Sequence, residues 1–195
     1  MAELEPHGQR QALRLHAFVG RSHANGPGAR AVLWTQGCRR RCPGCFNPDT
    51  HPHTGGVLVA VDALAAGLAA RAAANPSLEG VTLSGGEPLE QLEPLLALLR
   101  RLRRDTALST LLFTGYTWDE MLALPHADAL LTCLDVVIAG PYDPSQHLGA
   151  GLLGSANQTV YCLTSRYSTS AVAATPPAEA ILMGNGEVVW SGVGS

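Results

Sequence analysis

The stretch Cys38-Arg39-Arg40-Arg41-Cys42-Pro43-Gly44-Cys45 decides how the rest of the chain is interpreted, because it carries three cysteines at CxxxCxxC spacing. It follows the apolar run Ala31–Trp34, so we expect a loop that leaves the end of a strand. Cysteine thiolates are the usual ligands of iron–sulfur clusters, and a four-iron cluster ordinarily takes four of them. Three thiolates from one loop would leave one iron open to a ligand that is not protein.

Two other uses of the cysteines remain open at this point. A structural zinc ion could take its fourth ligand from His51, His53, Cys133 or Cys162. A disulfide is also possible, although five cysteines are an odd number. The spacing favours the cluster, so we expect both histidines to be loop residues and the two later cysteines to be buried as small hydrophobic side chains.

Composition restricts the kind of protein. A chain of 195 residues with 46% hydrophobic and 15% charged residues is typical of one globular domain. The net charge of −3 argues against a nucleic-acid partner. No apolar run approaches the roughly 20 residues of a membrane span, and residues 1–10 lack the apolar centre of a secretory signal. We therefore expect a cytoplasmic protein without a membrane partner, whose cysteines are reduced.

Strands and helices are predicted to alternate along the chain. This order predicts βαβ units and a parallel sheet, which right-handed crossovers would curl toward a partial barrel. After a linker at 165–177, Ile181–Trp190 is predicted to be a β-hairpin that turns at Asn185-Gly186. The expected strands are 13–19, 29–35, 80–84, 109–113, 134–139 and 160–164, and the expected helices are 61–74, 89–104 and one that begins at Thr117.

Two helix starts carry capping signals. Asp62 is expected to cap the helix 61–74. Thr117 with Glu120 fits the capping-box pattern. The leucines of 89–104 recur at helical spacing, so that helix should present an apolar stripe to the core.

Three sharp turns each follow a predicted strand: Cys38–Cys45, Gly85–Pro88 and Thr114–Tyr116. Parallel strands end at the same edge of a sheet, where the ligand sites of α/β proteins gather. We therefore expect these turns to converge on one site. Convergence strengthens the cluster interpretation more than any single motif does.

The turn Ser84-Gly85-Gly86-Glu87 is a candidate ligand cradle. Paired glycines allow close approach to a small molecule, and a glutamate can accept a hydrogen bond from an ammonium. The competing interpretation is a strand-to-helix turn whose glutamate compensates the helix N-terminus. Beside a cluster with an open iron, S-adenosylmethionine (SAM) fits better, because its amino and carboxylate groups would chelate the iron while Glu87 holds the ammonium.

The arginines at 39–41 have two interpretations. A solvated charge run is slightly favoured. The functional alternative is that they meet an acidic electron donor or raise the potential of the cluster.

Six segments occur in one order between residues 13 and 164. Together they resemble the activating enzymes of anaerobic (class III) ribonucleoside-triphosphate reductase, small members of the radical SAM superfamily. The segments are Asn25–Arg30 (NGPGAR), Cys42–Pro48 (CPGCFNP), Leu83–Leu89 (LSGGEPL), Phe113–Thr117 (FTGYT), Asp135 with Gly140–Asp143 (GPYD), and Gly154–Gln158 (GSANQ).

The resemblance implies a fold, a division of the chain and a set of site residues. It implies an α/β fold of the partial (β/α)-barrel type with mainly parallel strands and a C-terminal β-hairpin. Residues 1–12 would be a tail, 13–164 the radical SAM domain, and 165–195 a linker and hairpin extension. Cys38, Cys42 and Cys45 would bind three irons of a 4Fe-4S cluster, and SAM would bind the fourth. SAM would also contact Gly44, Phe46, Ser84, Gly85, Gly86 and Glu87.

The resemblance also implies a reaction. One electron from a flavodoxin-type donor would cleave SAM to methionine and a 5′-deoxyadenosyl radical. That radical would take a hydrogen atom from a glycine of the partner reductase, leaving a glycyl radical there. No catalytic residue is expected beyond those that hold cluster and SAM.

Three departures from the family pattern concern the substrate. His51 stands where the family commonly has tryptophan, Leu153 where an arginine often precedes GSxNQ, and residues 165–195 exceed the minimal enzyme. The alternatives are therefore another glycyl-radical enzyme, a peptide or a small molecule as substrate. A metal-stabilised binding module without catalysis is the alternative that is not an enzyme.

Overall fold

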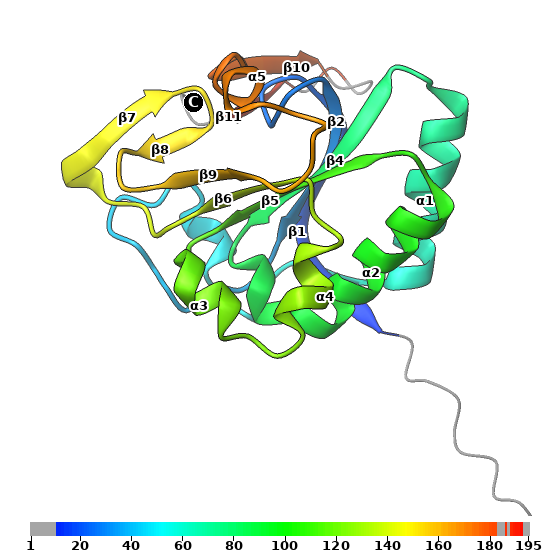
Figure 1. The fold of residues 1–195 in the computed structure, drawn as a ribbon, viewed down its shortest axis with the longest axis horizontal. Coiled ribbons are helices and arrows are strands. Elements are labelled where there is room, and N and C mark those ends of the chain that lie inside the picture. Colours follow the sequence, from blue (N-terminus) through cyan, green and yellow to red (C-terminus); the bar gives the residue numbers. More distant parts are fainter. Residues whose placement is uncertain (1–10, 183–185, 187, 193–195) are drawn as a thin grey trace, which may run out of the picture.

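The computed structural model describes residues 11–182, 186 and 188–192. Its centre is a seven-stranded sheet in the order β3-β1-β2-β4-β5-β6-β9 (Figure 1). The turn predicted at Asn185-Gly186 lies partly outside the described residues. The strands of this sheet are β1 (Ala12–Ser22), β2 (Ala29–Thr35), β3 (Val57–Ala60), β4 (Leu78–Gly85), β5 (Ser109–Thr114), β6 (Val136–Ala139) and β9 (Thr159–Cys162).

The middle of the sheet is parallel. β2, β4, β5 and β6 run in one direction, whereas β1, β3 and β9 join antiparallel to their neighbours. The edge strands β3 and β9 each pair with one neighbour and not with each other, so the sheet is open. The prediction of a mixed α/β fold with a mostly parallel central sheet is confirmed.

Helices cover one face of the sheet (Figure 1). They are α1 (Val61–Ala74), α2 (Leu92–Asp105), α3 (Trp118–Leu122) and α4 (Ala127–Leu131). The leucine stripe of α2 is buried as predicted and packs with β1, β2, β4 and α1 into the main core. The buried leucines of α2 are Leu95, Leu96, Leu98, Leu99 and Leu102.

The two predicted helix caps have different outcomes. Thr117 and Glu120 form the expected capping box at the start of α3. Asp62 was expected to cap α1, and this is wrong, because the N-cap residue is Ala60 and no side chain caps it. Asp62 instead lies in the first turn and pairs with Arg101 of α2 at 2.7 Å.

The opposite face carries smaller elements (Figure 1). The hairpin of β10 (Ala178–Leu182) and β11 (Val188–Gly192) lies there and confirms the predicted C-terminal hairpin. The predicted linker 165–177 is not all linker, because Ser168 caps a short helix, α5 (Thr169–Ala173). The sequence did not predict β7 (His147–Ala150) and β8 (Leu153–Ser155), which pair with each other. Within the described residues, no helix is long and apolar enough to cross a membrane.

A fully buried arginine joins the parallel strands. Arg30 of β2 donates from Nε to Thr82 Oγ1 at 2.7 Å and from Nη2 to the Val81 carbonyl at 2.9 Å, both on β4. It also donates from Nη1 to Ser109 Oγ at 2.9 Å, at the start of β5. Burial lowers its pKa, and these hydrogen bonds compensate the loss of water. Arg30 therefore fixes β2, β4 and β5 against one another.

Candidate metal centre and the adjoining pocket

The cysteine loop leaves the end of β2, as predicted. Cys38 is buried, whereas Cys42 and Cys45 are half-buried, and all three are free thiols. The amide of Cys45 donates to the Cys42 carbonyl at 3.2 Å, which folds the loop back on itself. All three cysteines line a single cavity of about 130 Å³, which we call the cysteine pocket.

The other two cysteines lie elsewhere. Cys133 is buried in the main core, and Cys162 lies on β9 against a second apolar cluster, so neither lines the cysteine pocket. All five cysteines are free, and no disulfide joins them. The prediction of a buried small hydrophobic side chain is confirmed for Cys133, whereas Cys162 is only half-buried.

The thiols are not arranged as a site for one ion. Among the described residues, no three His, Cys, Asp or Glu side chains lie close enough together to hold a single metal ion. A zinc ion needs four ligand atoms at about 2.0–2.3 Å from one point, whereas a four-iron cluster spreads its thiolates over separate corners. Burial raises the pKa of the Cys38 and Cys45 thiols, so loading a metal group would release protons.

The Gly85–Pro88 turn is fastened to the cysteine loop. Gly86 N donates to the Thr35 carbonyl at 2.8 Å, and Glu87 N donates to the Gly37 carbonyl at 2.9 Å. A Cβ atom on Gly86 would collide with the Gly37 carbonyl oxygen. Close approach of the two loops therefore requires glycine at position 86, whether or not a ligand is bound.

The carboxylate of Glu87 joins its own turn to the Thr114–Tyr116 turn. Its carboxylate accepts from Leu89 N at 3.0 Å, from Thr114 Oγ1 at 2.8 Å and from Gly115 N at 2.8 Å. The side chain is 1% exposed, and burial raises its pKa to about 7. Ser84, Gly85, Gly86 and Glu87 line the cysteine pocket together with Thr114, Gly115 and the cysteines. The predicted convergence of the three turns is confirmed.

The arginine run is not uniformly solvated. Arg39 and Arg41 are exposed, as expected, but the side chain of Arg40 is only 22% exposed. Arg40 pairs with Glu120 at 2.6 Å, and its guanidinium lies 4.3 Å from the centroid of the Tyr116 ring. The expectation of a solvated run is therefore wrong for Arg40, which ties the cysteine loop to α3.

Two buried nitrogen atoms beside the cysteine pocket have no hydrogen-bond partner. They are Arg40 Nε and His51 Nε2, and both residues line the pocket. A buried polar atom without a partner costs free energy unless another group satisfies it. An anionic group in this pocket would supply acceptors for such donors.

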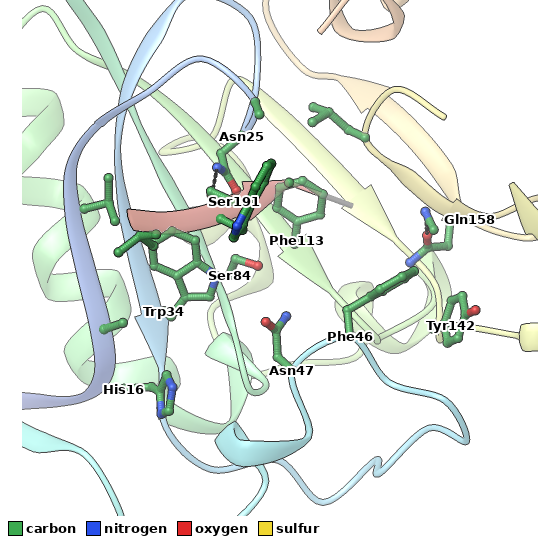
Figure 2. Close-up of a pocket in the computed structure, with 18 residues that line it drawn as sticks. His16, Asn25, Trp34, Phe46, Asn47, Ser84, Phe113, Tyr142, Gln158 and Ser191 are labelled. Carbon is green, nitrogen blue, oxygen red and sulfur yellow. Dashed lines mark hydrogen bonds between the residues drawn. The ribbon is translucent and has the colours of Figure 1, made fainter. Parts of the chain in front are cut away.

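A second cavity of about 270 Å³ adjoins the cysteine pocket, and we call it the central pocket (Figure 2). The two share six lining residues: Phe46, Asn47, Ser84, Phe113, Tyr142 and Gln158. Cofactor sites typically enclose about 300–1,000 Å³. The cysteine pocket alone is too small for that, whereas the adjoining pair together reach the lower end of the range.

Phe46 and Gly44 were both predicted to contact SAM, but only Phe46 lines the pockets. Phe46 lines both pockets and packs on Tyr142 with the ring centroids 4.8 Å apart. Gly44 has a positive φ of 67° and is not among the residues that line either pocket.

Sequence reasoning assigned no role to several pocket residues. Gln158 donates to the Gly140 carbonyl at 3.0 Å and accepts from Gly154 N at 2.9 Å, which joins the GPYD and GSANQ segments. For Tyr142 and Gln158, the only sequence signal of a role in the pocket was that they lie in the GPYD and GSANQ segments. For His16, Trp34 and the β11 residues, the sequence carried no such signal.

Comparisons with known proteins agree with this geometry. Residues 24–161 match the family model described as a 4Fe-4S single cluster domain. The chain is 30% identical over 156 residues to the anaerobic ribonucleoside-triphosphate reductase-activating protein of Vibrio cholerae, covering 78% of this chain and 99% of that protein. The protein of the same name from enterobacteria phage T4 is 30% identical over 145 residues, covering 72% and 88%. A pyruvate formate-lyase-activating enzyme from Clostridium pasteurianum is 36% identical over 122 residues, covering 60% and 50%.

Proposed function

The chain belongs to the 4Fe-4S radical SAM family of activating enzymes, and from that premise we propose that it installs a glycyl radical on an anaerobic ribonucleoside-triphosphate reductase. Cys38, Cys42 and Cys45 hold the cluster, and SAM occupies the open iron. The observation that carries this proposal is that the three thiols and the Ser84–Glu87 turn line one pocket.

The residues present fit a cluster with three protein ligands. Three thiols line the cysteine pocket, and no fourth cysteine does. Arg40 Nε and His51 Nε2 are buried beside it without partners, and the sulfides of a cluster are acceptors for such donors. The 4Fe-4S description of the matching family supports the same group.

The charged groups of SAM and its length together determine how it would lie across the two pockets. Its ammonium and carboxylate belong near the cluster, where Glu87 is the buried carboxylate of the pocket. An ionised carboxylate has about four lone-pair sites, and the three donors at Glu87 leave one for an N–H of the SAM amino group. From Ser84 and Phe46 the cofactor continues into the central pocket, which both residues also line. Gly85 and Gly86 border its amino-acid end, and Gly44 supports the loop.

Cluster and SAM supply the chemistry: one electron cleaves SAM to methionine, and the deoxyadenosyl group takes a hydrogen atom from a glycine Cα, leaving 5′-deoxyadenosine and the glycyl radical. The protein orients the reactants and excludes water. The electron donor is an acidic flavodoxin-type protein, since Arg39 and Arg41 are exposed next to Cys38 and Cys42. The partial (β/α) barrel implied for this family is part of the proposal, and the open, mostly parallel sheet with helices on one face supports it.

The test uses the whole protein under anaerobic conditions. Reconstitution with iron and sulfide should give a brown protein that releases 5′-deoxyadenosine from SAM when dithionite is added. Addition of the reductase from the same organism should then give the paramagnetic resonance doublet of a glycine-centred radical. Bound zinc without SAM cleavage would refute the enzyme. The match to a lyase-activating enzyme makes pyruvate formate-lyase the second substrate to test, and a doublet on the lyase alone would reassign the partner.

We expect Glu87→Gln to weaken SAM binding by roughly ten- to a hundredfold, because it removes one charge-assisted hydrogen bond worth about 1.5–3 kcal/mol. In the unaltered protein the affinity should rise with pH up to about 7, the pKa of this carboxyl, because the ionised carboxylate accepts from the SAM amino group more strongly than the protonated form does. The variant should lose that dependence. Isothermal titration of the cluster-loaded protein measures both.

Glu93→Gln is the matched control, since Glu93 is a largely exposed glutamate of α2. SAM affinity and its pH dependence should stay as in the unaltered protein. If Glu87→Gln binds SAM as tightly as the unaltered protein does, Glu87 only caps the turn that follows β4.

A further inference from the structure

The C-terminal hairpin lies outside the part of the chain shared with the family, yet it forms part of the central pocket. The family match ends at residue 161, and the Vibrio cholerae relative is covered almost completely by 78% of this chain. Even so, the β11 residues Val189–Gly192 line the central pocket, as do Phe46 and Ser84. This wall is an addition to the family's shared part.

The hairpin is fixed to the rim of the sheet by polar contacts. Asn25 Nδ2 donates to Ser191 Oγ at 2.6 Å, and the contact is buried (Figure 2). The carboxylate of Glu179 accepts from the amide of His23 at 3.0 Å. These contacts hold β10 and β11 to the segment that follows β1, so the wall has a defined position.

The central pocket is chemically different from the cysteine pocket. None of the described residues that line it is Asp, Glu, Lys or Arg. The Asn25 amide nitrogen already donates to Ser22 Oγ and Ser191 Oγ, so the polar groups that the hairpin offers here are the Ser191 hydroxyl and the Trp190 indole. A wall without charged side chains suits an uncharged peptide better than the charged end of SAM.

An apolar strip continues from the pocket to the outside. Trp190 lines the pocket but is 67% exposed, which places it at the mouth. Val188, two residues before it on the same face of β11, is 51% exposed, and its cross-strand partner Leu182 is 74% exposed. Exposed apolar side chains grouped at the mouth of a pocket mark an interaction surface.

We propose that the β10–β11 hairpin is the docking element for the partner protein, with Trp190, Val188 and Leu182 receiving the extended, uncharged segment that carries the target glycine. This inference rests on the proposed function. The strip explains how the segment is held outside, and Ser191 with Asn25 bounds the compartment into which the glycine enters.

The test compares partner binding with SAM binding in Trp190→Ala. The dissociation constant for the reductase should rise about tenfold or more, as for a central aromatic contact. That for SAM should change by less than about twofold, because Trp190 is 67% exposed at the mouth of the pocket, whereas SAM is proposed to enter beside Ser84 and Phe46. The glycyl-radical yield at limiting reductase should fall in parallel. Val188→Ser is a second variant, expected to weaken reductase binding by a smaller factor.

Leu58→Ala is the matched control. Leu58 is 59% exposed on β3, which pairs with the beginning of β1, whereas the hairpin contacts the segment after its end. It should leave both affinities unchanged. Reductase affinity that is unchanged in Trp190→Ala, or SAM affinity weakened as much as reductase affinity, overturns the docking role. A wild-type protein that forms no glycyl radical refutes the proposed function instead.

Discussion

Cys42→Ala is expected to abolish cluster assembly and, with it, the release of 5′-deoxyadenosine. Two thiolates cannot hold a four-iron cluster against loss to the solvent, and no other cysteine lines the pocket to replace the third. The protein should still fold, because Cys42 is half-buried in a loop and its carbonyl continues to accept from Cys45. Iron and sulfide analysis after anaerobic reconstitution measures the loss, and circular dichroism measures the fold.

Cys162→Ala is the control for this prediction. Cys162 is a half-buried cysteine on β9, away from the cysteine pocket. Its replacement should leave the iron content and SAM cleavage as in the unaltered protein. Full cluster content in Cys42→Ala, or loss of the cluster in Cys162→Ala, would refute the assignment of Cys38, Cys42 and Cys45 as the ligands.

The site was largely predictable because local signals fix it. A strand followed by a cysteine or glycine turn occurs three times, and parallel pairing brings the ends of β2, β4 and β5 to one edge. The sequence therefore predicted that the cysteines, Glu87 and Thr114 meet. The same logic predicted the bounds of β2 and α1, where apolar patterns and turn residues agree.

The rest depends on contacts between distant parts of the chain. Glu179 binds the amide of His23 across 156 positions, and no local pattern indicates that the hairpin would close the central pocket. Arg40 looked like one of three solvated charges until Glu120 and Tyr116 were brought beside it. Pairing of β7 with β8 and the helix α5 were likewise missed, because their sequences are too short to show a periodic apolar pattern.

Arg30→Met is expected to lower the free energy of unfolding by about 3 kcal/mol or more. Methionine fills similar volume without donors, so acceptors on β4 and β5 that Arg30 satisfies are left unpaired in the interior. Arg30→Lys should also be destabilising, because its three donors leave from one atom and cannot span both strands. Urea unfolding measures both losses, and Arg101→Met is the control, since its pair with Asp62 is largely exposed and worth about 0–1 kcal/mol.

Arg30 lies at the end of the parallel strands away from the cysteine pocket, so its replacement should affect the stability of the fold and not the cluster site. It lies near the start of β2, and Ser109 is the first residue of β5, whereas the cysteine loop and Thr114 lie at the opposite ends of those strands. Arg30→Met should therefore load a normal amount of cluster per folded molecule at low temperature while unfolding earlier. A variant as stable as the unaltered protein would show that Arg30 does not join the strands. A stable variant without its cluster would place Arg30 in the site itself.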